Sequence, residues 1–178
     1  MTAILSPCGL FRYSLARQVA PLPVLLPDEA HALRGKTLAF FGVNPSTADA
    51  AVNDATVVKL IGFCKRWGVS RFLLGNAFAY RATDVRELAK VDDPFGDDIG
   101  EHVTDLIEAA DVLVPMWGDT GKVPPKLRFA FDVLLEKLQD SGKPVLCFGH
   151  TKAGDPKHPL MLGYQTQLVP FTVGDDAD

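Results

Sequence analysis

The sequence predicts an α/β protein: a three-layer α/β/α sandwich around a central, mainly parallel four-stranded sheet, with an added N-terminal strand or hairpin. Two observations lead to this prediction. Short apolar runs that suit buried strands alternate with amphipathic segments that suit helices, and the chain shows four such runs. Strand–helix–strand units in this order form a parallel sheet that helices cover on both faces. The length of 178 residues, without a repeat or a linker, predicts a single domain over 1–178.

The N-terminal part contributes one strand ahead of the repeating units. Apolar and polar residues alternate between Gly9 and Gln18, which indicates a strand. Three prolines then interrupt regular structure, and residues 28–35 suit a short helix. The first apolar run follows over residues 37–45, and it predicts a strand that is buried on both faces.

The first long helix is expected after this strand. Asp54 or Thr56 can cap its N-terminus, and Gly68 can end it. The apolar residues of this helix recur at helical spacing, namely Val57, Leu60, Ile61, Cys64 and Trp67. The second buried strand is expected after the helix, over 71–80.

The last third of the chain repeats the alternation. An amphipathic helix is expected over 97–110 and an apolar strand over 111–118. The next helix is expected over 124–142. It begins with two prolines, which the first turn of a helix tolerates, and it ends at a glycine. Residues 144–150 are the fourth expected strand, and residues 171–178 are an acidic tail that we expect to be solvated.

Charge and cysteine content exclude several classes of protein. Lys and Arg number 18 against 22 Asp and Glu, so the net charge of −4 excludes a broadly basic surface for duplex DNA. Three separated cysteines without a CxxC pair argue against a zinc or iron–sulfur centre, and we expect no metal and no cofactor. The N-terminus lacks the pattern of an export signal, and no apolar stretch is long enough to span a membrane. We therefore expect a cytoplasmic protein without membrane contact.

A ligand is expected at the carboxyl ends of the strands, because open α/β sheets bind ligands in the crevice outside these ends. The segments that follow the strands are also rich in polar residues, Gly and Pro. These segments are residues 44–49, 76–84, 117–122 and 150–160.

The first two segments each begin with an asparagine. Asn44 can donate and accept hydrogen bonds in a site, but equally Ser46 or Thr47 can cap a short helix while Asn44 satisfies backbone groups of the loop. Asn76 ends an apolar strand, and its amide can pair in two directions with the edge of a nucleobase.

The residues after Asn76 allow two interpretations. Phe78 and Tyr80 offer aromatic faces for stacking, and Arg81 can bind a phosphate. Alternatively, Phe78 belongs to the core and Arg81 to the surface, because large apolar side chains are usually interior.

The last two segments differ in what they can bind. Residues 117–122 lack the spacing of a Walker A loop and suit a polar turn. The final segment carries four side chains that can donate hydrogen bonds, which favours an anion site over a metal site. These side chains are His150, Lys152, Lys157 and His158.

Together these segments resemble the family named domain of unknown function 1643. The resemblance extends from about Gly9 to Pro170. Ala55 stands where the family usually has Pro, and FGDDIG (95–100) lacks the usual Asn–Asp pair. The motifs that carry the resemblance are GVNPSTAD (42–49), NAFAYRATD (76–84), WGDTG (117–121) and GHTKAGDPKHPL (149–160).

A more distant resemblance is to the uracil-DNA glycosylase superfamily. GVNPS is similar to its first motif, although Ser46 replaces a glycine of one branch. FLLGNAF (72–78) is similar to the strand whose terminal Asn binds the edge of the base, VLVPMWG (112–118) to an apolar strand ending in Trp-Gly, and HPL (158–160) to a histidine-containing loop. The cysteines of the iron–sulfur branches are missing.

The glycosylase resemblance implies roles for individual residues. Asn44 would position the attacking water, and Asn76 would bind the base. His158 would donate a hydrogen bond to the departing base, with His150 as the competing candidate. Asn44 cannot take a proton from water, and the nearby carboxylates that can assist are Asp49, Asp54 and Asp84.

We therefore expect a hydrolase that cleaves the N-glycosidic bond of a nucleobase in a nucleotide or in single-stranded or flipped DNA. The alternative is a binding module for nucleotides or single-stranded nucleic acid that performs no chemistry. Lys and Arg outnumber acidic residues within 122–158, so weak and salt-sensitive binding of nucleic acid remains compatible with the net negative charge of the whole chain. The residues expected to bind the substrate are Pro45, Ser46, Asn76, Phe78, Tyr80, Arg81, Lys152 and Lys157.

Overall fold

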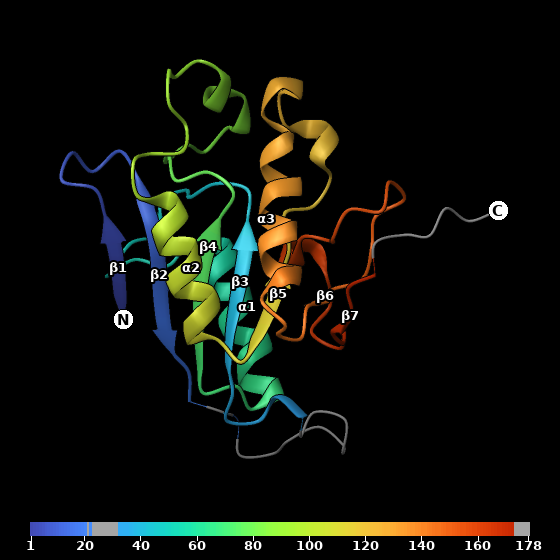
Figure 1. The fold of residues 1–178 in the computed structure, drawn as a ribbon. Coiled ribbons are helices and arrows are strands. Elements are labelled where there is room, and N and C mark those ends of the chain that lie inside the picture. The colour runs from blue at the N-terminus through green and yellow to red at the C-terminus, as the bar shows by residue number, and fades with distance from the viewer. Residues whose placement is uncertain (21, 23–31, 173–178) are drawn as a thin grey trace.

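The protein is an α/β protein with a five-stranded mixed sheet (Figure 1), and the computed structural model describes residues 1–20, 22 and 32–172. The strand order is β1-β2-β4-β3-β5. β3 runs parallel to β4 and β5, whereas β2 is antiparallel to β1 and β4. The strands are β1 (Thr2–Leu5), β2 (Arg12–Gln18), β3 (Thr37–Gly42), β4 (Arg71–Asn76) and β5 (Val112–Pro115).

The N-terminal strand prediction is confirmed and becomes a hairpin. The strand begins at Arg12 rather than Gly9, because residues 7–10 form a turn in which Gly9 has a φ of 74°. β2 runs opposite to β4, so its first residue lies beside the carboxyl end of β4. There the backbone N–H of Arg12 donates to the carbonyl of Ala79 at 2.9 Å.

The parallel part of the sheet has three strands instead of the predicted four. Within residues 144–150 only β6 (Leu146–Cys147) is a strand, and it pairs antiparallel with β7 (Val169–Pro170) in a small separate sheet. This segment touches β5 through a single parallel bridge between Leu113 and Val145. Proline at position 144 has no N–H to donate, and Leu146 and Cys147 pair with β7, so this segment does not extend the parallel sheet.

Helix α1 (Ala55–Trp67) has the ends that the sequence predicts. The Asp54 carboxylate accepts a hydrogen bond from the backbone N–H of Val57 at 2.9 Å, and Gly68 ends the helix with a φ of 68°. The cap fixes the direction in which α1 leaves the loop after β3. Asp54 is therefore held at the start of α1, close to the carboxyl end of β3.

The other two helices also follow the predicted segments. They are α2 (Ile99–Ala109) and α3 (Phe129–Asp140). The third helix starts later than predicted because Pro125–Leu127 form a separate 3₁₀ turn. The expected short helix over 28–35 and most of the acidic tail over 171–178 lie largely outside the described residues.

Helices cover both faces of the sheet, with α2 and α3 on the near face and α1 on the far face of Figure 1. Two cores result, because adjacent strand residues point to opposite faces. Phe40 and Phe72 pack with α1, whereas Phe41 and Leu73 pack with α2 and α3. The strand ends thus meet at one edge between two filled cores. Within residues 1–20, 22 and 32–172, no helix is long and apolar enough to cross a membrane.

Candidate active site

A polar pocket of about 170 Å³ lies at the carboxyl ends of β3 and β4. It is smaller than the roughly 300–1,000 Å³ of pockets that hold drug-sized ligands, so it suits a single ring or a small polar group. Four of the residues predicted to act on or bind a substrate, from three separate loops or strand ends, line it together. The lining residues are Arg12, Gly42, Val43, Asn44, Ser46, Asp54, Thr56, Leu74, Asn76, Met116 and His158.

Asn76 is the last residue of β4, and its side chain is 6% exposed. Its Nδ2 is buried and has no hydrogen-bond partner among the described residues. Gly42 pairs with it across the sheet, and a Cβ at position 42 would lie 2.9 Å from the Asn76 Oδ1. A buried polar group without a partner is uncommon and costs stability. Since Asn76 lines the pocket, a ligand with an acceptor atom would satisfy it.

Asn44 is held in one orientation by the loops around it. Its Nδ2 donates to the carbonyls of Ala82 at 2.7 Å and of Pro45 at 3.1 Å. Both donors of the amide are thus used, which leaves Oδ1 as the atom that can accept a hydrogen bond from water. This geometry suits the positioning of a water molecule.

His158 presents a donor to the pocket. Its Nδ1 accepts from the backbone N–H of Leu160 at 3.3 Å, so the neutral ring carries its proton on Nε2. Burial lowers the pKa of His158, and the nearby Asp54 carboxylate partly opposes this effect. Gly118, with a φ of 76°, leaves room for the ring, because a Cβ there would lie 3.3 Å from the His158 Cβ. At neutral pH the imidazole is therefore an uncharged hydrogen-bond donor.

Arg12 is a pocket residue that sequence reasoning missed. Its side chain is 2% exposed, its Nη1 donates to the carbonyl of Ala48 at 2.6 Å, and its Nε has no partner in the described part of the chain. Burial lowers the pKa of Arg12 to about 10, against the opposing effect of Asp54. The guanidinium stays charged at neutral pH. The available signal was an arginine within an otherwise alternating strand, but only the antiparallel pairing places it at the site.

The loop before α1 is held from β2 by a second buried arginine. Arg17 is 1% exposed and donates to the Asn53 Oδ1 at 2.8 Å and to the Asp49 carbonyl at 2.5 Å. Arg12 and Arg17 together fix residues 48–53 and, with them, the position of Asp54. Asp54 is thus a pocket carboxylate at the end of a loop that two arginines of β2 hold in place.

The other two carboxylates that we considered lie outside the pocket. Asp49 closes a turn by accepting from the backbone N–H groups of Ala51 and Val52, both at 2.8 Å, and these bonds lower its pKa. Asp84 pairs with Arg86 at 2.6 Å on the surface. Asp49 and Asp84 thus bind partners outside the pocket, whereas Asp54 caps α1 and also lines the pocket.

The aromatic residues after β4 do not line the polar pocket. Phe78 is fully buried and packs against Phe95 and Phe131, as the core alternative predicts. Tyr80 is half-buried and packs edge-on against Phe11, with ring centroids 5.8 Å apart. Stacking of a base on either ring therefore finds no geometric support in this pocket.

The four candidate side chains of the final loop lie in different surroundings. His158 lines the pocket, while His150 packs against Phe171 with its Nε2 3.9 Å from the Cys147 Sγ. Lys152 and Lys157 are exposed and are not pocket residues. In the described ranges, no three His, Cys, Asp or Glu side chains gather to hold a metal ion.

A second, more open pocket of about 310 Å³ adjoins the first, and Ser46 lines both. Its only arginine, Arg81, donates to the carbonyl of Gly9 at 3.3 Å and makes a long contact of 3.5 Å with the carbonyl of Ser46. Pro45 is buried in the loop between β3 and Ser46. The lining residues are Ser46, Thr47, Arg81, Ala82, Thr83 and Glu87.

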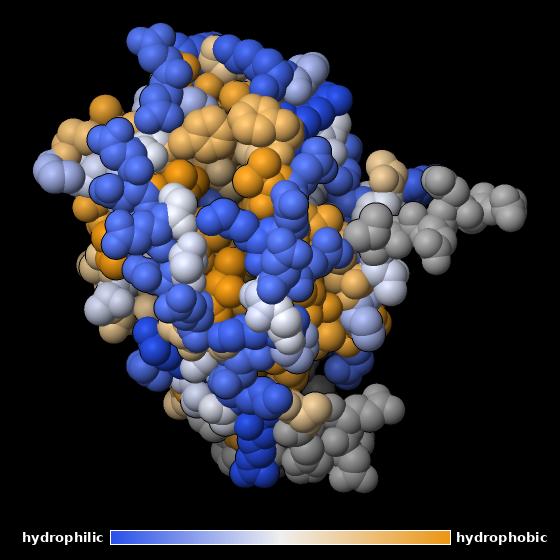
Figure 2. Space-filling model, in the orientation of Figure 1, coloured by the Kyte–Doolittle hydropathy of each residue, from blue (hydrophilic) through white to orange (hydrophobic). Residues whose placement is uncertain are grey.

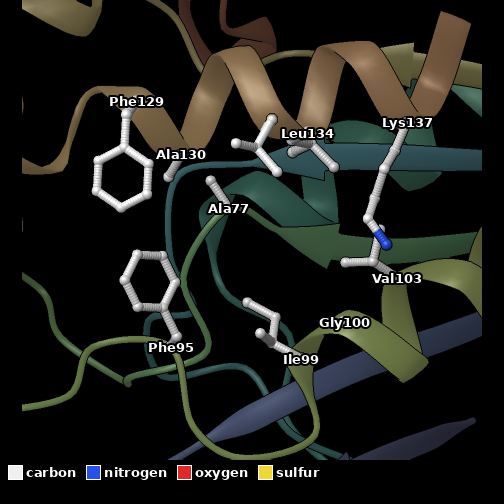
Figure 3. Close-up of a pocket in the computed structure, with 10 residues that line it drawn as sticks. Ala77, Phe95, Ile99, Gly100, Val103, Phe129, Ala130, Leu134 and Lys137 are labelled. Atoms are coloured by element: carbon white, nitrogen blue, oxygen red, sulfur yellow. The ribbon is translucent and has the colours of Figure 1, made fainter.

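A third pocket, of about 110 Å³, lies between α2 and α3 and is almost wholly apolar (Figure 3). Phe95 and Phe129 lie at one end, with ring centroids 5.9 Å apart, and Lys137 lies at the other. Figure 2 shows the hydrophobic surface of this face between the polar outer sides of the helices. Without convergent polar groups this pocket offers no chemistry. Its lining is Ala77, Phe95, Ile99, Gly100, Val103, Phe129, Ala130, Val133, Leu134 and Lys137.

Comparison with known proteins gives one match. The sequence model of the family described as "Protein of unknown function (DUF1643)" matches residues 12–160. No curated protein and no solved structure matches the chain. The matched segment begins at Arg12 and extends just past His158, so it contains every residue of the polar pocket.

Proposed function

Because this chain belongs to the DUF1643 family, and the matched segment contains the whole polar pocket, we propose that this pocket is an active site that hydrolyses the N-glycosidic bond of a nucleobase. The substrate is a nucleotide, or a nucleotide within single-stranded or flipped DNA. The proposal includes the finer resemblance to uracil-DNA glycosylases, both in the order of motifs and in an α/β/α arrangement of layers.

The observation that carries the proposal is the convergence of Asn44, Asn76 and His158 on one small pocket. These residues lie far apart in the sequence, and the glycosylase resemblance requires them to meet. The pocket adds the two charged groups that the chemistry needs, Asp54 and Arg12. Its size matches a single base rather than a larger ligand.

The reaction follows from the positions of these groups. The bond between the sugar C1′ and the base nitrogen breaks, its electron pair leaves with the base, and positive charge develops on the sugar. Hydrogen bonds from Asn76 Nδ2 and His158 Nε2 stabilise the negative charge on the departing base. Water held by the Asn44 Oδ1 adds its oxygen to C1′.

The proton balance assigns a role to Asp54. The attacking water loses one proton to the Asp54 carboxylate, which then releases it to solvent, and the departing base gains a proton from solvent. The products are the free base and a sugar with a hydroxyl group at C1′. Arg12 lies in the same pocket, and its positive charge stabilises the negative charge of the departing base.

The test measures release of free base by chromatography. The probes are uridine and inosine, their 5′-monophosphates, and single-stranded oligonucleotides containing uracil or hypoxanthine. We expect release from at least one probe and a loss of about 100-fold or more in Asp54→Asn, since a positioned general base contributes on that order. Asp84→Asn, on the surface, is the matched control and should keep full activity. A folded protein that releases no base from any probe would overturn the proposal.

A second candidate is a nucleotide-binding module without chemistry. The observation that favours it is that one oxygen of Asp54 already accepts a hydrogen bond as the cap of α1, so this oxygen is engaged in a structural role. Calorimetry separates the two functions. Binding of a nucleotide that depends on Asn76, without turnover, would support the module.

A further inference from the structure

The two polar pockets at the strand ends adjoin at Ser46. Both are built from the loops after β3 and β4, so one ligand can extend from the small pocket into the open one. A base that occupies the small pocket would thus direct its sugar and any group on that sugar towards the second pocket.

Arg81 supplies the second pocket with an available positive charge. Its guanidinium is half-buried and anchored to main-chain carbonyls, chiefly that of Gly9. No carboxylate forms an ion pair with it within residues 1–20, 22 and 32–172. By contrast, the neighbouring Arg86 is paired with Asp84 through two nitrogens. A guanidinium that is anchored to main-chain carbonyls and has no carboxylate in direct contact is preorganised to bind an anion such as a phosphate.

The rest of the second pocket limits which phosphate fits. Hydroxyl groups from Ser46, Thr47 and Thr83 can donate to a phosphate or accept from a sugar. Glu87 lies in the same pocket, and its carboxylate favours sugar hydroxyls but repels a second phosphate. A pocket that combines the cationic Arg81 with the anionic Glu87 therefore suits a sugar that carries a single phosphate and free hydroxyls.

We propose that the substrate is a free nucleoside 5′-monophosphate, with its base in the small pocket and its phosphate on Arg81. This inference rests on the proposed function, because it takes the base position from it. A nucleotide inside a strand offers the same base but carries phosphates on both sides of the sugar, and Glu87 disfavours the second one. The acidic net charge of −4 agrees with a small substrate rather than a polyanion.

The test compares three probes for each base by calorimetry at fixed salt. They are the nucleosides uridine and inosine, their 5′-monophosphates, and trinucleotides with the base in the centre. We expect the monophosphate to bind roughly tenfold or more tightly than the nucleoside, and the trinucleotide to bind no better than the nucleoside. Arg81→Ala should remove the gain from the phosphate, so that the nucleoside and its 5′-monophosphate bind this variant with equal affinity. Arg86→Ala, the matched control, should keep the gain.

The outcomes separate this inference from the proposed function. Nucleoside binding that needs Asn76, without any gain from the phosphate or without its loss in Arg81→Ala, overturns the substrate assignment alone. A trinucleotide that binds more tightly than the monophosphate also overturns it and identifies a strand as the substrate. Absence of binding and of base release for every probe overturns both proposals.

Discussion

The polar pocket and the apolar pocket between α2 and α3 are lined by consecutive residues of the chain. Asn76 lines the first and Ala77 lines the second. In the polar pocket, Arg12 and Asn76 each have a buried nitrogen that finds no partner in the described part of the chain. In the apolar pocket, side chains of both helices pack on the sheet with only Lys137 as a charged member. One region holds unsatisfied polar groups that lower stability, while the other contributes stability through burial.

The residues of the two pockets therefore contribute to different properties of the protein. Consecutive residues at the end of β4 serve two different pockets, so a substitution on one side need not disturb the other. Unsatisfied groups persist at functional sites because a ligand satisfies them. The comparison predicts that stability and ligand binding respond to different residues, and four substitutions or conditions test this, ordered by their expected effect on the free energy of unfolding.

The largest effect is expected from Leu134→Ala in the apolar pocket. Leu134 is 4% exposed, and truncation of a buried leucine removes burial and leaves a cavity. The free energy of unfolding should fall by about 2–5 kcal/mol, as measured by urea denaturation. The affinity of the folded variant for a nucleotide should stay unchanged. A parallel loss of affinity in folded protein would contradict the division between the pockets.

Asp54 allows a matched pair of variants. Asp54→Ala removes the cap of α1 and should cost about 1 kcal/mol in the free energy of unfolding. Asp54→Asn preserves the cap, because asparagine caps helices as well as aspartate does, and its stability should match the wild type. Both variants should lose base release. If Asp54→Asn retains base release at the wild-type rate, Asp54 is not the general base.

Asn76→Ala should affect stability less than the preceding changes. The substitution removes packing, but it also removes a buried donor that has no partner in the described structure, and these effects oppose each other. We expect a change of less than about 1 kcal/mol in urea denaturation. Calorimetry should show that nucleotide binding is lost. A destabilisation as large as that of Leu134→Ala would show that the amide has a structural partner.

The smallest effect is a dependence on pH through His158. Burial lowers its pKa in the folded protein, so below the unfolded value of about 6.5 the unfolded chain binds a proton more readily. The contribution of His158 to stability is therefore complete above that pH and is lost as the pH falls towards the folded pKa. His158→Gln does not titrate, so urea denaturation should show its stability rising relative to the wild type between neutral and mildly acidic pH. A constant difference across this range would mean that burial does not lower the pKa of His158.

Much of this arrangement can be predicted from the sequence. Asp54 and Gly68 mark the ends of α1 because a cap and a left-handed glycine act locally. Asn44 and Asn76 meet because the carboxyl ends of the parallel strands β3 and β4 share one edge of the sheet, whereas His158 joins them from the loop after the separate strand β6. These predictions need only local chemistry and a general rule of topology.

Other features depend on long-range pairing and could not be predicted. Arg12 reaches the site because β2 runs antiparallel to β4, and alternation within one strand does not reveal its neighbour or direction. His150 and His158 share one loop, and only the packing of His150 against Phe171 separates them. Phe78 offers the same ring to a core or to a ligand, and its position was decided by the phenylalanines around it.

The hairpin that supplies Arg12 and Arg17 makes the site a candidate for fragment reconstitution. Residues 1–20 contain both arginines, whereas Asn44, Asp54, Asn76 and His158 all belong to the rest of the chain. Removal of this segment would leave the loop over 48–53 without its two anchors. We expect a synthetic peptide of residues 1–20 to dock on the open edge of β4 and restore nucleotide binding. The recovered signal would then report docking of the N-terminal hairpin, whose inner strand β2 carries both arginines.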